Sequence, residues 1–242
     1  MELIRDTMDF RAYEGEPEAH QKVREASTYA GDLIAALEAP QSARGAFMPW
    51  SKTREQFRIR PNELTLYPGI NGHGKSLVLN QIMVGLMGQG ERVLISSMEM
   101  KPTATLGRMV RQAVGTATPT AADVEAFMGW SAGKLFIYDH LGSVQWRKLL
   151  AVMRYCAAEL GVTQFVVDSL MRCGIGEQDY DGQKAFIDAL CTLRMDYPVH
   201  VHLVMHSRKR EDENSPPGKF DAKGTGTMTD LADNVITTWR NK

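Results

Sequence analysis

The stretch that most limits the fold of this chain is residues 67–76, which read YPGINGHGKS. It follows a short apolar run at 63–66 and opens into a helical pattern of apolar residues from Leu77 onward. Glycines allow backbone N–H groups to turn inward as an anion-binding nest, and the following helix presents its positive end. The order Gly, four residues, Gly, Lys, then Ser or Thr is typical of a phosphate-binding loop. The alternative, a Gly-rich turn before an ordinary helix, is disfavoured by the strand and helix flanks.

The chain is therefore predicted to bind a nucleoside triphosphate, ATP or another NTP, together with Mg²⁺. Lys75 is expected to reach the β- and γ-phosphates, and Ser76 to hold the metal ion. The predicted nucleotide-binding residues of the loop are Gly69, Asn71, Gly72, His73, Gly74, Lys75, Ser76 and Leu77.

Composition limits what else the chain can be. Charged residues make up 24% of the 242 residues and the formal net charge is −1, so any basic, nucleic-acid-binding surface must be local. The three cysteines have no paired spacing, which indicates neither a disulfide framework nor a zinc site. No apolar run approaches membrane-spanning length, and the N-terminus does not resemble a signal peptide. We expect a soluble cytoplasmic protein with no membrane partner.

Apolar runs alternate with amphipathic stretches along the chain. Strands are expected at 92–97, 134–138, 164–168, 199–205 and 234–239, and helices at 102–114, from a cap at 118–120 to 128, at 144–160 and at 183–195. Most of these strands are apolar without alternation, which is typical of a mostly parallel β-sheet covered by helices on both faces. We therefore predict an α/β fold.

The N-terminal part is predicted to differ from this core. Residues 1–60 are assigned to a linker and a helix, and residues 61–242 to the nucleotide-binding domain. Apolar residues between 20 and 37 form one stripe along a helix. That stripe would pack either on the core of its own chain or on a neighbouring subunit, and the sequence leaves both alternatives open.

Parallel α/β sheets bind their ligands beyond the carboxyl ends of the strands, so polar residues at those ends are candidates for chemistry. Asp168 closes the apolar run FVVD and is either a Mg²⁺-orienting carboxylate or a common turn residue. Glu99 follows RVLISS and a Met; it either orients the water that attacks the γ-phosphate or is an ordinary charge before a helix. His206 closes VHVHLVM and is either a γ-phosphate reader or a structural histidine, as His200 and His202 on the same run suggest.

The segment after His206 is rich in basic residues, with four acidic residues among them. Such a loop is usually only solvated, but a basic cluster beside a γ-phosphate reader can grip a nucleic-acid backbone. The candidate DNA-binding residues are Arg208, Lys209, Arg210, Lys219 and Lys223. The loop 172–182 has the same placement after Asp168 but is mostly acidic, so it would contribute backbone N–H groups more than charge.

Five segments, taken together, carry a resemblance to a known family. They are IRPNELTLYPGINGHGKS, VLISSMEM, the stretch from LFIYDHLG to FVVDSLM, VHLVMHSRKR and KGTGTMTDLADNVITTWRN. In this order they resemble the RecA-like motor domain of hexameric replicative DNA helicases, nearest to the phage primase-helicase and Twinkle branch, with the DnaB group further off. The resemblance covers about residues 61–242 and implies a RecA-like P-loop NTPase core.

The resemblance also implies roles for single residues. Glu99 in SSMEM matches the family's catalytic glutamate, and His206 matches the γ-phosphate sensor of the phage branch, where the DnaB group has glutamine. Lys75 is implied as a catalytic phosphate ligand, with Ser76 and Asp168 as the metal site. The loops after Asp168 and His206 match those that hold single-stranded DNA in the central channel. Arg240 matches an arginine near the nucleotide base.

The function implied is an ATP-dependent replicative DNA helicase motor that translocates on single-stranded DNA in phage or prophage replication. It would form a homo-oligomer, a hexameric ring, in the bacterial host cytoplasm, with a primase or other replisome protein as partner. In the family, the arginine finger lies on a strand beyond the point that corresponds to residue 242. Either the chain is therefore a fragment whose motor domain lacks its last strands, or its finger comes from elsewhere. The alternatives are a RecA-type recombination or repair ATPase, and an ATP-binding loader or scaffold without motor output.

Overall fold

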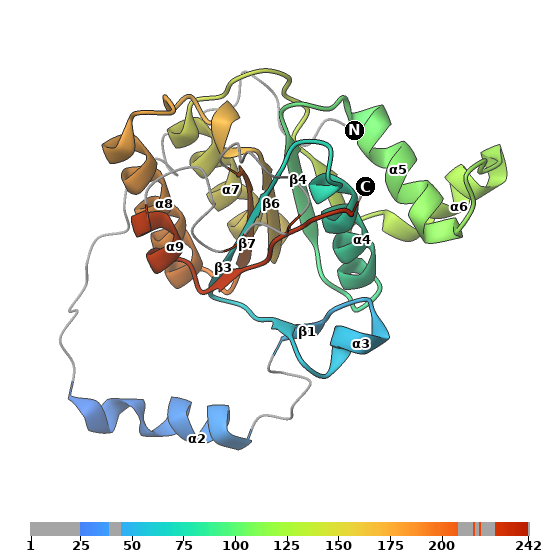
Figure 1. The fold of residues 1–242 in the computed structure, drawn as a ribbon. Coiled ribbons are helices and arrows are strands. Elements are labelled where there is room, and N and C mark those ends of the chain that lie inside the picture. Colours follow the sequence, from blue (N-terminus) through green and yellow to red (C-terminus); the bar gives the residue numbers. More distant parts are fainter. Residues whose placement is uncertain (1–24, 39–44, 208–214, 216–217, 219–225, 242) are drawn as a thin grey trace.

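Six strands form one parallel sheet in the computed structural model of the chain (Figure 1). They are β3 (Glu63–Gly69), β4 (Val93–Ser97), β5 (Leu135–Ile137), β6 (Gln164–Asp168), β7 (His200–His206) and β8 (Asn234–Val235), in the spatial order β5-β4-β6-β7-β3-β8. The structure describes residues 25–38, 45–207, 215, 218 and 226–241. The predicted α/β fold with a mostly parallel sheet is confirmed.

Helices cover both faces of this sheet. They are α4 (Lys75–Met87), α5 (Pro102–Val114), α6 (Ala121–Ser131), α7 (Trp146–Leu160), α8 (Tyr180–Asp196) and α9 (Gly226–Leu231). Side chains of α7, α8 and α9 form one apolar cluster with the sheet, and those of α4, α5 and α6 form the other. On β6, Phe165 and Val167 join the first cluster whereas Val166 joins the second. Successive side chains point to opposite faces, so a strand buried on both faces must be apolar throughout.

Several element ends differ from the prediction. Helix α7 begins at Trp146 rather than at Val144, whose N–H donates to Arg172 O. Helix α8 begins three residues early, at Tyr180, because the Asp179 side chain caps it by accepting from Gly182 N. The last strand, predicted to reach residue 239, is only β8, and helix α9 was not predicted. The predicted cap before α6 is confirmed as a capping box between Thr120 and Asp123.

A short hairpin precedes the sheet, where the sequence had indicated only a linker. Strands β1 (Ala46–Phe47) and β2 (Arg58–Ile59) pair antiparallel around helix α3 (Ser51–Arg54). Ile59 is buried among residues of α4, and Phe47 exchanges hydrogen bonds with the Gln89 side chain, which follows α4. The hairpin is therefore part of the folded core.

The predicted N-terminal helix is present as a turn, η1 (Ala26–Tyr29), followed by α2 (Ala30–Glu38). Its apolar stripe is not covered: Leu33, Ile34 and Leu37 are each more than half exposed. Packing on the core of its own chain is thus not seen in the described residues, and docking on a neighbouring subunit stays a prediction. None of the helices described has the length and apolar character to cross a membrane.

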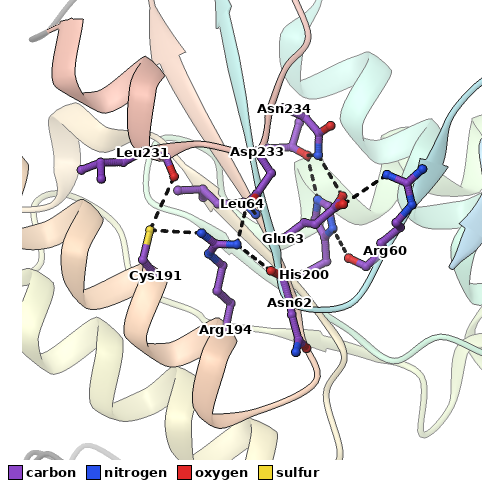
Figure 2. Close-up of polar contacts among 11 residues, drawn as sticks. Arg60, Asn62, Glu63, Leu64, Cys191, Arg194, His200, Leu231, Asp233 and Asn234 are labelled. Atoms are coloured by element: carbon purple, nitrogen blue, oxygen red, sulfur yellow. Dashed lines mark hydrogen bonds and ion pairs between the residues drawn. The ribbon is translucent and has the colours of Figure 1, made fainter. Parts of the chain in front are cut away.

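The segment that leads into β8 lies beside β3. Polar side chains at the amino ends of β3 and β7 form a cluster with it (Figure 2). Asp233 Oδ2 accepts a hydrogen bond from Leu64 N at 2.7 Å and pairs with Arg194 Nη1 at 2.7 Å. The same Arg194 nitrogen donates to Asn62 O at 2.6 Å. This cluster fixes α8 and the segment that leads into β8 against the edge of β3.

Candidate nucleotide-binding site

The predicted phosphate loop lies between β3 and α4, as the sequence indicated. Strand β3 ends at Gly69 and α4 begins at Lys75, so the loop occupies the carboxyl end of the strand. Gly72 and Gly74 have positive φ angles of 78° and 87°. This left-handed conformation strongly favours glycine and turns the backbone N–H groups of the loop toward one side.

Gly69 is required for a second reason, the close approach of the C-terminal segment. A Cβ atom at this position would lie 2.8 Å from Thr238 O and 3.1 Å from the Lys75 Cδ atom. Beyond Thr238, the backbone N–H of Arg240 donates to His73 Nδ1 at 3.2 Å. Arg240 therefore lies beside the phosphate loop, together with the other predicted nucleotide-binding residues.

Lys75 is folded over the loop that precedes it. Its Nζ donates to Gly69 O at 2.8 Å and to Ile70 O at 3.0 Å. Burial lowers the pKa of Lys75, and the nearby charges of Asp168 and Glu99 oppose that shift. The ammonium group is thus held at the point where the phosphates of a nucleotide would bind.

Ser76 and Asp168 meet across the sheet. Ser76 Oγ donates to Asp168 Oδ2 at 2.6 Å, although strand β7 separates β3 from β6 in the sheet. Burial raises the pKa of Asp168, and the nearby charge of Glu99 acts in the same direction. The hydrogen bond from Ser76 and the charges of Lys75 and His206 oppose this rise without cancelling it. A hydroxyl and a carboxylate are oxygen ligands of the kind that Mg²⁺ takes, and this ion completes its shell with waters and phosphate oxygens. These two residues therefore fit the predicted metal site.

In the described ranges, no group of three or more His, Cys, Asp or Glu side chains is arranged so that it could hold a metal ion by itself.

Glu99 lies beside the residue that follows Asp168. Ser169 Oγ donates to Glu99 Oε1 at 3.2 Å, and Arg172 Nε lies 3.5 Å from the same oxygen. The Glu99 side chain remains partly exposed. An accessible carboxylate held on one side by two donors is suited to accept a proton from a water molecule.

His206 connects the phosphate loop to the end of β6. Its Nδ1 is hydrogen-bonded to Asn71 Oδ1, and its Nε2 lies 3.5 Å from Ser169 Oγ. Strand β7 places His206 directly beside Gly69, its register partner on β3. The structure thus brings Glu99, His206, Lys75, Ser76 and Asp168 together at one edge of the sheet.

Not every predicted site residue is brought to this cluster. The five candidate DNA-binding residues Arg208, Lys209, Arg210, Lys219 and Lys223 lie outside the described residues. Leu77 lies in the first turn of α4 with about half of its side chain exposed.

Among the solved structures that resemble this fold are two that cover about 90% of the chain, whereas no protein-family model matches it. One is "ATPase Domain of G40P", with a TM-score of 0.69 and 16% identity over 89% of this chain and 84% of that one. The chain has the RecA-like fold of such ATPase domains. The other is "The Structure Of A DnaB-Like Replicative Helicase And Its Interactions With Primase", with a TM-score of 0.67 and 13% identity. The match covers 90% of this chain and 58% of that one. The resemblance drawn from the sequence motifs is confirmed at the level of the fold.

Three residues of the site escaped the sequence analysis. Ser169 bridges Glu99 and His206, Arg172 pairs with Glu99, and Thr238 closes over Gly69. Only Ser169 carried a signal, since it directly follows the strand-end aspartate. The other two are brought in by tertiary packing, which no local pattern announces.

Proposed function

We propose that this chain is an ATP-dependent replicative DNA helicase motor that translocates on single-stranded DNA. The observation that carries the proposal is the hydrogen bond between Ser76 Oγ and Asp168 Oδ2, with Glu99 and His206 gathered around Ser169 beside it. It joins the two motifs of a nucleotide hydrolysis site to a carboxylate and a histidine at the ends of neighbouring strands. The fold shared with helicase ATPase domains supports the same assignment.

Ser76 and Asp168 would hold Mg²⁺, which when bound supplies positive charge against the phosphates. Lys75 leaves the carbonyl oxygens of Gly69 and Ile70, to which it is bonded here, and donates to the phosphates instead. The backbone N–H groups of the loop bind the same anionic groups. These contacts position the nucleotide and stabilise the charge that develops during transfer.

Glu99 acts as the general base. Its carboxylate accepts a proton from the attacking water while Ser169 and Arg172 hold its Oε1 atom in place. Arg172 follows β6 by only four residues, so movement of the segment after Asp168 changes the contacts of Glu99 directly. The reaction is thereby coupled to a loop that we assign to DNA contact.

His206 senses the γ-phosphate. It is hydrogen-bonded to Asn71 in the phosphate loop and lies within reach of Ser169, so a change in the loop alters the end of β7. The segment that follows β7 carries the candidate DNA-binding residues Arg208, Lys209, Arg210, Lys219 and Lys223. We assign these residues to the backbone of single-stranded DNA.

The assembly belongs to the same proposal. We infer a homo-oligomeric, hexameric ring in which α2 docks on the neighbouring subunit, and a primase or other replisome protein as partner. A phage or prophage origin would place the protein in the bacterial cytoplasm. The exposed stripe of Leu33, Ile34 and Leu37 supports the docking of α2, because such a stripe is usually covered in an assembly.

Unwinding of a fluorescent forked DNA duplex in the presence of ATP and Mg²⁺ tests the proposal. Strand separation that is lost in Lys75→Ala supports it, with Lys184→Ala, a change of an exposed lysine on α8, as the control. Filament formation on DNA with strand exchange, instead of unwinding, would establish the recombinase alternative. ATP binding without DNA-dependent turnover would establish the loader or scaffold alternative.

A further inference from the structure

A small pocket adjoins the Ser76–Asp168 hydrogen bond. Ser76 and Asp168 line it, together with the polar residues Asn80 of α4, Ser97 of β4 and Thr105 of α5. The space in it that the centre of a water-sized sphere can reach is about 10 Å³. This is close to the roughly 10–15 Å³ that one water molecule needs on the same measure, so the pocket has room for about one water and not for a larger ligand.

Three buried polar groups around this pocket lack a hydrogen-bond partner. They are Asn80 Nδ2, Ser97 Oγ and Thr105 Oγ1, and the parent residues are 4%, 8% and 3% exposed. A buried donor or acceptor that stays unpaired destabilises the folded state, because it has lost its hydrogen bonds to water without replacement. These three groups belong to three different elements whose residues line one pocket, which indicates that something polar occupies it.

The geometry points to a site for ordered water in this pocket, with Asn80, Ser97 and Thr105 as positioning residues for the metal ligand Asp168. Asn80 Nδ2 can only donate, whereas the two hydroxyls both donate and accept, and a water molecule offers two donors and two acceptor sites. A water bound to these groups has a donor left for the Asp168 carboxylate. It would extend the hydrogen bonds around the metal site inward, between the layers of α4, α5 and the sheet.

The role for Asp168 as a metal ligand rests on the proposed function, but the water site itself does not. Hydrogen bonds to a ligating carboxylate hold its orientation, and removing them typically weakens metal binding about 10–100-fold. Thr105 stands in the first turns of α5, the helix that follows Glu99. The water therefore also connects the metal ligand to the segment that carries the general base.

Substitution of Thr105 by Val tests this inference, because the two side chains have the same shape and differ in the hydroxyl. If water is bound, Thr105→Val removes one of its partners and lowers the melting temperature of the protein without nucleotide or metal. If the pocket is dry, the same change removes an unpaired buried hydroxyl and raises the melting temperature. The sign of the shift thus separates the two cases.

The effect of these residues on metal binding at Asp168 is measured by the Mg²⁺ dependence of binding of a fluorescent ATP analogue. Thr105→Val and Ser97→Ala are each expected to raise the Mg²⁺ concentration for half-saturation by about tenfold. Thr105→Ser keeps the hydroxyl and should retain the wild-type value, and Thr103→Val, an exposed position on the same helix, is the matched control. An unchanged Mg²⁺ requirement in both Thr105→Val and Ser97→Ala would overturn the positioning role.

A high-resolution crystal structure of the whole chain provides the direct readout. Density for water within hydrogen-bond distance of Asn80 Nδ2 and Thr105 Oγ1 supports the site, and a pocket without density overturns it. Wild-type protein that binds no nucleotide would overturn the proposed function instead. In that case the melting temperatures and the density still decide the water site.

Discussion

Ser76 and Asp168 are separated by 92 positions in the sequence, yet Ser76 Oγ lies 2.6 Å from Asp168 Oδ2. Parallel strands bring their carboxyl ends to one edge of the sheet, and this contact is the direct consequence. The side chains on either side of it, Lys75 and Glu99, complete an arrangement suited to phosphoryl transfer.

The serine hydroxyl is expected to matter mainly when Mg²⁺ is present. Ser76→Ala should leave the binding of metal-free ATP close to wild type and abolish the gain in affinity that Mg²⁺ gives, because the variant lacks one metal ligand. Equilibrium titration with and without Mg²⁺ measures this difference. Ser76→Thr keeps a hydroxyl in place and serves as the control. Equal Mg²⁺ dependence in Ser76→Ala and wild type would contradict the assignment.

His206 is expected to support both turnover and its response to DNA. His206→Ala removes the donor aimed at the phosphate loop, and we expect kcat for ATP hydrolysis to fall by about 10²-fold, with loss of stimulation by single-stranded DNA. His206→Gln can still donate from its carboxamide and should keep part of both. Steady-state assays with a DNA titration measure these values. Wild-type kcat in His206→Ala would show that the histidine is only structural.

The phosphate loop and the strand-end aspartate could be predicted because each is encoded locally. A glycine-rich turn between a strand and a helix, and a carboxylate at the end of an apolar run, are visible within about ten residues. Arg172 and Thr238 could not be found in this way, because their roles depend on which segments pack together. Ser169 follows the aspartate directly, but the sequence does not show that it lies between Glu99 and His206. The β1–β2 hairpin was missed for a different reason: two-residue strands carry no hydrophobic period.

The apolar stripe of α2 could be predicted from the sequence, but the surface that covers it could not. Its spacing predicts a helix, and α2 is one, but the same spacing does not say what covers Leu33, Ile34 and Leu37. In the structure, no described part of the chain covers these three side chains. Whether a neighbouring subunit covers them depends on the assembly.

Two buried histidines on β7 should make the fold sensitive to acid. His200 lies between Arg60 O, at 2.6 Å from Nδ1, and Thr65 Oγ1, at 2.8 Å from Nε2. His202 lies between Tyr67 Oη and Gln164 Oε1, each 3.0 Å away. Burial lowers the pKa of both imidazoles from the ordinary value of 6.5, most strongly for His202. Their surroundings therefore favour the neutral rings.

The direction in which stability changes with pH follows from proton binding to the two histidines. Below about pH 6.5 the unfolded chain takes up protons at these histidines and the folded chain does not, so stability present at neutral pH is lost as the pH falls. Each histidine contributes a slope of up to about 1.4 kcal/mol per pH unit. Urea unfolding at pH 7.5, 6.5 and 5.5 measures it. His202→Gln should flatten the dependence relative to wild type. Parallel curves for His202→Gln and wild type would rule out the explanation.

The Arg194–Asp233 cluster is expected to hold the C-terminal segment against the phosphate loop (Figure 2). Asp233→Ala removes the acceptor of Leu64 N and the partner of Arg194, and should lower the free energy of unfolding by about 1.5–3 kcal/mol. Because that segment leads to Thr238 and Arg240, nucleotide affinity should fall as well. Chemical denaturation and nucleotide titration measure the two effects, with the exposed Asp188→Ala on α8 as control. Wild-type nucleotide affinity in a destabilised Asp233→Ala protein would separate the cluster from the site.

ATP hydrolysis with and without single-stranded DNA, measured on the wild-type chain and on Glu99→Gln, tests the helicase-motor assignment. We expect wild-type turnover that rises with DNA, and a variant that binds ATP with unchanged affinity but has lost turnover, since its amide cannot accept the proton. Glu159→Gln, a change remote from the loop on α7, should behave as wild type. A Glu99→Gln protein that still hydrolyses ATP, or wild-type turnover that ignores DNA, would contradict it.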